Sequence, residues 1–193
     1  AGWMENSVRE FRRLYRYMSP RSFVASRIEL LAQGFSGSRI KNWYQRGRLI
    51  KVIRGVYSLG RDVESADAAM RAALAFAGPG AVLTGISACQ KWGMVKSRFR
   101  IPLYIEVAKS TGKARKQNGS SPAMRNTAVN VIRRRFEPTE VRTRDGLRLT
   151  CPALALIDFA VNASDREVRF AFLEACRLRL FTEKDLKYCF TRM

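Results

Sequence analysis

Hydroxyl, amide and basic side chains recur at helical spacing in residues 36–47, SGSRIKNWYQRG. At 100° per residue, Asn42 and Gln45 point away from an apolar side formed by Ile40, Trp43 and Tyr44. Asparagine and glutamine amides match the N6 and N7 edge of adenine, arginine suits guanine, and lysine or serine suits phosphate. The pattern therefore predicts a helix in the major groove of DNA, with candidate contacts Ser38, Arg39, Lys41, Asn42, Gln45 and Arg46.

An exposed helix that is merely polar would give the same helical wheel. The flanking sequence favours the DNA interpretation. Ser36 is a natural N-cap, Gly34 and Gly47 are natural helix ends, and residues 1–60 hold 12 basic against 3 acidic residues. Agreement between caps, turns and charge is stronger support than the wheel alone.

A basic hairpin is predicted directly after this segment. The spacing of apolar residues changes from a helical to an extended pattern in LIKVI and VYSLG, with a turn at Arg54-Gly55 between the two segments. Arg48, Lys51 and Arg54 are placed to contact phosphates or to put one arginine into a minor groove. We expect them to supply affinity rather than sequence choice.

A second basic block occupies residues 96–150, with 14 basic and 4 acidic residues. Alternation along a strand would send Arg133 and Arg135 to one face and Arg134 to the other. A second DNA-contacting surface is slightly favoured, but an acidic protein partner would use the same side chains. The candidate residues are Arg133, Arg134, Arg135, Arg142, Arg144 and Arg148.

Patterns typical of enzymes are weak. Glu106 and Lys109 resemble the carboxylate and lysine of metal-dependent nucleases, but their spacing is one residue too long. Ser110 and Lys113 resemble a serine-lysine pair, but they lie in a polar, loop-like stretch. Asp158, on an otherwise apolar helix, is interpreted as a buried residue that fixes the fold.

Cysteine and histidine usage also argues against catalysis and metal binding. The sequence has no histidine, which removes imidazole bases and histidine ligands. Its four cysteines lack the short spacing of zinc or redox motifs and are expected to be isolated thiols. We therefore predict a non-enzymatic protein with no catalytic residues, no cofactor and no metal site.

The elements that must position the DNA-contacting residues can be predicted from the same stretch. Residues 5–18 have one apolar side and one arginine-rich side, and the basic side is equally well interpreted as solvated surface or as a phosphate contact. Ser19-Pro20 ends that helix. The next helix is expected to open at Pro20 or Ser22 and to bury Phe23, Val24, Ile28, Leu30 and Leu31.

Beyond residue 60 the pattern predicts an α+β unit. Helices are expected at 67–77, 86–93, 152–161, 166–178 and 183–190, with caps at Ser164 or Asp165 and at Thr182. Strands are expected at 103–108, 128–132 and 147–150, and residues 109–127 are expected to form a loop. The predicted fold class is α+β: an N-terminal winged helix-turn-helix domain (1–60) and a mixed C-terminal domain (61–193).

The overall charge favours a polyanionic partner. The chain has 36 lysines and arginines against 16 acidic residues, a net charge of +20. Neutralised phosphates release counterions, which drives association. No apolar run is long enough for a membrane span and no secretory signal is evident, so a cytoplasmic protein that does not bind membranes is expected.

The order of segments resembles a known family. The strings GFSGSRIKNWYQRGRLIKVIRGVYSLG, AGPGAVLTGISACQKWG, IPLYIEV and GLRLTCPALALIDFA, within residues 21–177, are similar to the AbiEi-type antitoxins of bacterial abortive-infection toxin-antitoxin systems. The most specific elements are Arg54-Gly55-Val56-Tyr57, Leu83-Thr84-Gly85 with Ser87-Ala88 before Trp92-Gly93, and Leu149-Thr150 with Pro152 and Asp158.

The resemblance implies a winged helix that binds inverted repeats in the promoter of its own operon, and a second domain that antagonises a nucleotidyltransferase-like toxin. Three functions remain open at this point. The favoured one is an autoregulating repressor and antitoxin. The second is a stand-alone regulator, including a phage or plasmid repressor, whose second domain dimerises or adds DNA contacts. A nuclease is the least favoured, and the oligomeric state, a monomer in solution or a dimer on DNA, is left open.

Overall fold

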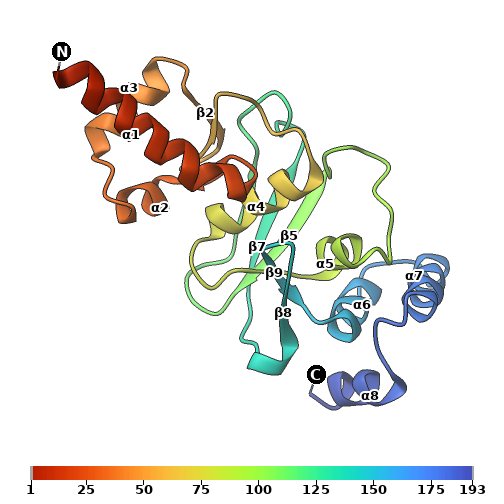
Figure 1. Ribbon diagram of the computed structural model, residues 1–193. Helices are drawn as coiled ribbons and strands as arrows, with labels where there is room; N and C mark the ends of the chain where they lie inside the picture. The colour runs from red at the N-terminus through yellow and green to blue at the C-terminus, as the bar shows by residue number, and fades with distance from the viewer. Residues whose placement is uncertain (1, 193) are drawn as a thin grey trace.

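The computed structural model describes residues 2–192 and has a mixed α+β fold, as predicted (Figure 1). Within the first 60 residues the strands form a sheet with the order β1-β3-β2, in which both pairs are antiparallel. The elements are α1 (Gly2–Met18), the 3-10 turn η1 (Ser19–Arg21), β1 (Val24–Ser26), α2 (Arg27–Ala32), α3 (Gly37–Gln45), β2 (Leu49–Ile53) and β3 (Val56–Leu59).

The local signals for α3 and the hairpin are confirmed. The Ser36 hydroxyl accepts a hydrogen bond from the backbone N–H of Arg39 at 3.2 Å, which caps α3. The hairpin turns at Arg54 and Gly55, and Gly55 has a φ of 75°. This left-handed conformation favours glycine, because a side chain would be strained there.

The predicted start of α2 is wrong. Ser22 and Phe23 have positive φ values of 53° and 60°, so the chain cannot continue as a helix there. Val24 instead begins β1, whose pairing with β3 places it opposite Ser58. The helix starts only after Ser26, so Ile28 is 68% exposed rather than buried, and Leu31 is exposed as well.

The second sheet is mixed, with the order β6-β7-β5-β4-β9-β8. Parallel pairing joins β5 to β7 and β4 to β9, and the remaining neighbours are antiparallel. The strands are β4 (Val82–Leu83), β5 (Tyr104–Lys109), β6 (Arg115–Asn118), β7 (Ala128–Arg133), β8 (Val141–Arg144) and β9 (Leu147–Thr150), with the 3-10 turn η2 (Pro138–Glu140) before β8.

The segment 109–127 is not a continuous loop. It contains β6, whose sequence RKQN is polar and largely exposed. β6 lies at the edge of the sheet and pairs only with β7. Polar and charged residues are typical of edge strands, which have little apolar surface to bury, and this explains why the composition of the segment predicted a loop.

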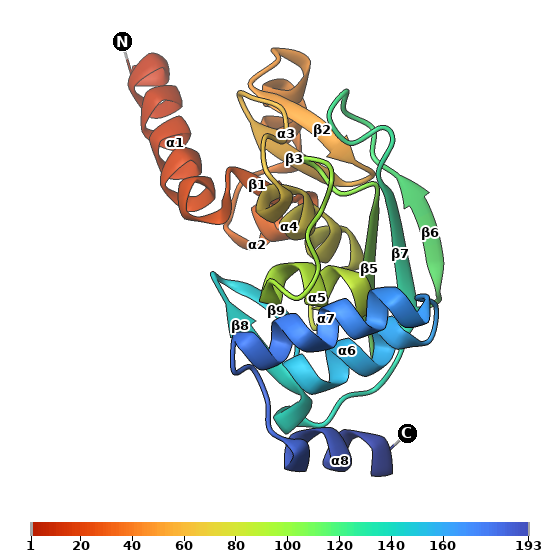
Figure 2. The same cartoon turned by 90° about the vertical axis from the view of Figure 1, so that its right-hand side faces the viewer.

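Five helices complete this part of the described chain: α4 (Ala66–Ala77), α5 (Gly85–Trp92), α6 (Pro152–Ala160), α7 (Asp165–Arg177) and α8 (Glu183–Thr191). The predicted caps Ser164 and Thr182 both form capping boxes. Figure 2 shows α5, α6 and α7 stacked on one side of the larger sheet, with α8 beyond them and α1 projecting at the opposite end.

Helix α4 joins the two sheets. In Figure 1 it lies on the opposite side of the larger sheet from α5, next to the small sheet. The main hydrophobic core continues across it, from Val52 and Val56 of the small sheet, through Ala69 and Ala73 of α4, to Ile105 of the large one. A second core, centred on Trp43, lies under α1 and α3. None of the described helices is long and apolar enough to cross a bilayer.

Candidate nucleic-acid interface

Helix α3 has one fully buried side. Ile40 is completely buried and Trp43 is 1% exposed. The Trp43 ring meets the Phe35 ring edge-on, with 5.4 Å between centroids, and the Phe11 ring of α1 at 6.5 Å. These contacts fix the rotation of α3 about its own axis, and this rotation decides which side chains face solvent.

The opposite side of α3 carries exposed polar and basic residues. The side chains predicted to enter the groove are all exposed, namely Ser38, Lys41, Asn42, Gln45 and Arg46. Tyr44 was expected on the buried side but is 46% exposed. It lies at the margin of the helix and packs on Tyr57 of β3, with ring centroids 5.9 Å apart. This contact ties α3 to the hairpin.

Arg39, one of the predicted DNA contacts, is engaged by another side chain of the fold. Its Nη2 atom lies 2.7 Å from Oε2 of Glu10 on α1, and both side chains are partly buried. Arg13 of α1 also donates to the backbone carbonyl of Gln33 and lies over the Phe35 ring. Arg39 therefore helps to hold α1 against α3, and its guanidinium is less available to DNA than those of its neighbours.

The predicted hairpin contacts lie beside α3. Arg48, Lys51 and Arg54 are all exposed. Arg48 also lies over the Phe11 ring, 5.2 Å from its centroid, and Lys51 is paired across the hairpin with Tyr57, the tyrosine that meets Tyr44. The polar side of α3 and the basic hairpin are thus coupled through aromatic contacts.

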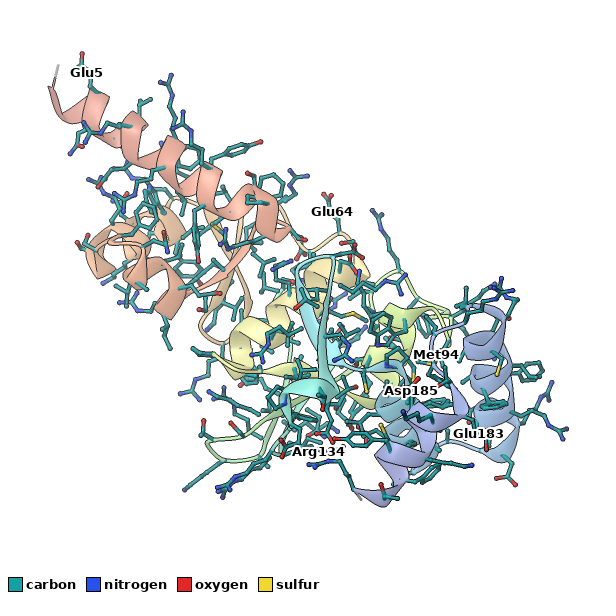
Figure 3. The ribbon with its side chains drawn as sticks, turned by 60° about the horizontal axis from the view of Figure 1, so that its bottom comes forward. Glu5, Glu64, Met94, Arg134, Glu183 and Asp185 are labelled. Atoms are coloured by element: carbon teal, nitrogen blue, oxygen red, sulfur yellow. The ribbon has the colours of Figure 1, made fainter. Side chains whose placement is uncertain are left out.

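Helix α1 adds basic side chains that the site prediction omitted. Arg9, Arg12 and Arg16 are exposed and follow a spacing of three and four residues, which places them along one side of the helix. Figure 3 shows side chains tipped with nitrogen along α1. The spacing was visible in the sequence, whereas the contacts that join this helix to α3, the Arg39–Glu10 ion pair and the Phe11–Trp43 ring contact, depend on the tertiary structure.

Two arginines of the second group are engaged within the fold, and the other four line two hollows that share Ser110 and Phe136. Arg134, labelled in Figure 3, pairs with Asp158 of α6 at 2.5 Å. Arg144 donates to the backbone carbonyl of Trp92 at 3.3 Å and lies over its ring. The others remain at the surface: Arg133 and Arg135 flank one hollow, and Arg142 and Arg148 line another.

The nuclease-like pair is separated by the strand that carries it. On β5, the Glu106 carboxylate accepts hydrogen bonds from Thr84 Oγ1 at 2.9 Å and from the Tyr104 hydroxyl at 3.2 Å. Lys109 donates instead to the carbonyl of Ala77 at the end of α4, at 3.2 Å. Residues three apart on a strand face opposite sides, so these two side chains cannot act at one site.

Other catalytic or metal-binding groupings are not evident in residues 2–192. Ser110 and Lys113 lie around the turn between β5 and β6. No three cysteine or acidic residues of the described chain gather where they could hold a metal ion. The four cysteines are free thiols, and burial raises the pKa of Cys89 well above its ordinary value.

Comparison with known proteins does not identify the chain. No model of a known protein family matches the sequence, and no curated protein matches it either.

Proposed function

We propose that the protein is a DNA-binding transcription regulator that reads duplex DNA through a winged helix-turn-helix. In this proposal α2 and α3 form the helix-turn-helix, α3 enters the major groove, and the β2–β3 hairpin is the wing on the phosphate backbone. The exposed side chains of Asn42 and Gln45 read base edges. Arg48, Lys51 and Arg54 contact phosphates, and the arginines of α1 lengthen that contact.

One observation carries the proposal. Trp43 and Ile40 lock one side of α3 into the core, and the opposite side is exposed, rich in amides and bases, and coupled to a basic hairpin by the Tyr44–Tyr57 contact. A helix needs such a fixed, projecting polar side to place side chains against base edges.

The experiment is selection of bound sequences from a pool of random duplexes, followed by fluorescence anisotropy on the enriched duplex. Asn42→Ala or Gln45→Ala is expected to weaken binding about 5–150-fold, and only for duplexes that carry the preferred base pair. Arg54→Ala is expected to weaken binding to every duplex and to reduce the salt slope by about 1. Lys184→Ala, the loss of an exposed lysine on α8, is the matched control. Absence of binding to both enriched and random duplexes at moderate salt would refute the proposal.

The antitoxin role is a further part of the proposal, and an exposed apolar patch supports a protein partner. Phe170 and Leu173, one helical turn apart on α7, are 58% and 55% exposed. Large exposed apolar side chains at such spacing are typical of a protein-binding surface. The proposed partner is a nucleotidyltransferase-like toxin encoded next to this protein. Phe170→Asp is expected to abolish rescue of growth from that toxin and to leave DNA binding unchanged. Equal rescue by the variant, or no such adjacent gene, would favour a stand-alone regulator.

A further inference from the structure

A cleft lies between the N-terminal elements and the larger sheet. It encloses about 300 Å³, near the lower end of the range for small-molecule sites. One wall comes from η1, β1 and α2, and the other from α4, the Gly78-Pro79-Gly80 turn and the β8–β9 hairpin. Figure 1 shows α2 and α4 as neighbours at this junction. No candidate DNA contact on α3 or the β2–β3 hairpin lines the cleft.

Three arginines from distant parts of the chain line the cleft: Arg21, Arg71 and Arg148. The acidic residue in the lining is Glu29, and its carboxylate is already engaged, because it accepts a hydrogen bond from the backbone N–H of Ser26 at 2.6 Å in the capping box of α2. The cleft therefore has a surplus of positive charge that its own carboxylate does not neutralise.

Arg71 is the least satisfied of the three arginines. Its Nε atom is buried and has no hydrogen-bond partner among the described residues. Its Nη2 atom makes a long contact of 3.4 Å with the carbonyl of Asp145. Burial lowers the pKa of Arg71, and the nearby charge of Arg21 lowers it further. Arg71 and Arg21 repel each other, and the carboxylates of Asp67 and Glu29 offset part of that repulsion.

The remaining walls leave room beside these charges and are largely apolar. Ile28, Leu74, Ala75, Pro79 and Ala81 line the cleft. Gly146 lies next to Arg71, where a Cβ atom would come within 3.0 Å of Nη2. The cleft thus combines three cationic side chains with apolar walls, an arrangement suited to a ligand with one anionic and one apolar part.

We propose that this cleft binds a small phosphorylated molecule about as large as a mononucleotide. Guanidinium groups provide planar donors that phosphate oxygens accept in pairs. Nη1 of Arg21 already donates to the backbone carbonyl of Tyr17 at 2.8 Å, so its remaining N–H groups and those of Arg71 and Arg148 hold the phosphate, and the apolar walls hold the ring system. Because the ligand contacts both walls, it links the N-terminal elements to the larger sheet.

The test is calorimetric titration of the full chain, at constant ionic strength, with inorganic phosphate, adenosine, and AMP, GMP, CMP and UMP in turn. At least one mononucleotide is expected to bind at one site per chain, about tenfold or more tightly than either phosphate or adenosine. At about 100 times its Kd, that mononucleotide is expected to raise Tm by roughly 5–10 °C. The absence of saturable binding by all four mononucleotides would overturn the proposal.

Variants locate the site. Arg71→Gln and Ala75→Met are each expected to weaken mononucleotide binding at least about tenfold, the first by removing a donor and the second by filling the cleft. Arg148→Gln changes an exposed residue of the cleft and replaces Arg71→Gln in this test if that variant does not fold. Arg98→Gln removes an equal charge from an exposed residue outside the cleft and is expected to bind normally. Unchanged affinity in the cleft variants would overturn the proposal.

The phosphates of DNA could also occupy the cleft. The same variants distinguish binding of the DNA backbone from binding of a mononucleotide. Arg71→Gln and Ala75→Met are expected to bind duplex DNA within about twofold of the unmodified protein, whereas Arg54→Ala should not. An equal loss of duplex and mononucleotide binding in Arg71→Gln would assign the cleft to the DNA backbone and overturn the proposal. Failure of DNA binding altogether would refute the regulator proposal but leave the mononucleotide titration valid.

Discussion

The ion pair between Arg134 and Asp158 provides a direct test of how the C-terminal part of the fold is stabilised. Arg134 follows β7, Asp158 lies on α6, and their side chains are 28% and 9% exposed. The second carboxylate oxygen of Asp158, Oδ2, is buried without a partner among the described residues. Arg134→Gln therefore leaves a nearly buried carboxylate without its counter-charge.

The size of the effect follows from burial. Breaking a fully buried ion pair from one side costs about 3–5 kcal/mol. Because the guanidinium of Arg134 is partly exposed and partly screened by water, we expect a loss of about 2–3 kcal/mol of unfolding free energy at pH 7. For a chain of this length, that corresponds to a decrease in Tm of roughly 5–10 °C.

The loss should depend on pH. Burial raises the pKa of Asp158 above its ordinary value of 3.8, and Arg134 opposes that rise. A carboxyl with a raised pKa in the folded state stabilises the fold below its ordinary pKa, and this contribution is lost as the pH rises toward the folded value. Without Arg134 the pKa rises further. The variant should therefore nearly match the unmodified protein below about pH 4 and be less stable at neutral pH.

Urea unfolding followed by circular dichroism at pH 4 and pH 7 measures both effects. Arg133→Gln, one residue earlier and exposed, is the matched control and should change stability by less than about 0.5 kcal/mol. Asp158→Asn in the Arg134→Gln background should recover most of the loss, because it removes the unpaired charge. An Arg134→Gln loss that is equal at both pH values, or absent, would refute the reasoning.

Three further outcomes follow from the structure. Trp43→Ala should lower the free energy of unfolding, measured in urea, by about 3–5 kcal/mol, because it leaves a cavity in the core between α1 and α3. A loss under about 1 kcal/mol would contradict that packing. Ser26→Ala should cost about 1 kcal/mol by removing the capping box of α2, whereas no change would place the start of this helix elsewhere. A thiol reagent should modify exposed Cys176 rapidly and Cys89 only on unfolding, because Cys89 is buried and its pKa is raised. Mass spectrometry of the folded protein measures both reactions, and early modification of Cys89 would contradict its burial.

Local signals predicted much of the fold. Ser36, Ser164 and Thr182 cap helices where a short polar residue precedes an amphipathic run, and Gly55 turns the hairpin. These signals depend on neighbouring residues in the chain, so a sequence contains them in full. The mixed α+β class followed from the same signals.

Elements that depend on distant partners were missed. Strand β1 has only three residues, β4 has two, and β6 is a polar edge strand. Such segments are too short or too polar to show a period, and each exists because a partner strand provides its hydrogen bonds. For β1 that partner is β3, more than 30 residues later in the chain.

The candidate nucleic-acid interface also has a part that the sequence predicted and a part that only tertiary contacts determined. The residue types on α3 and their helical spacing were determined by the sequence, and so was the excess of basic residues. Which of these side chains are exposed and which are engaged depends on tertiary contacts. Glu10 engages Arg39, Asp158 engages Arg134, and packing of Trp43 sets the rotation of α3.

The sequence by itself determined the local elements and the chemical groups available on each. Only the tertiary structure decided which groups meet, because ion pairs and clefts join residues whose separation along the chain leaves no periodic trace. The cleft lined by Arg21, Arg71 and Arg148 is the clearest case. Arg21 and Arg71 had no role predicted from the sequence, and Arg148 was predicted only as part of a second basic surface; the three line one cleft because α4 packs against both sheets.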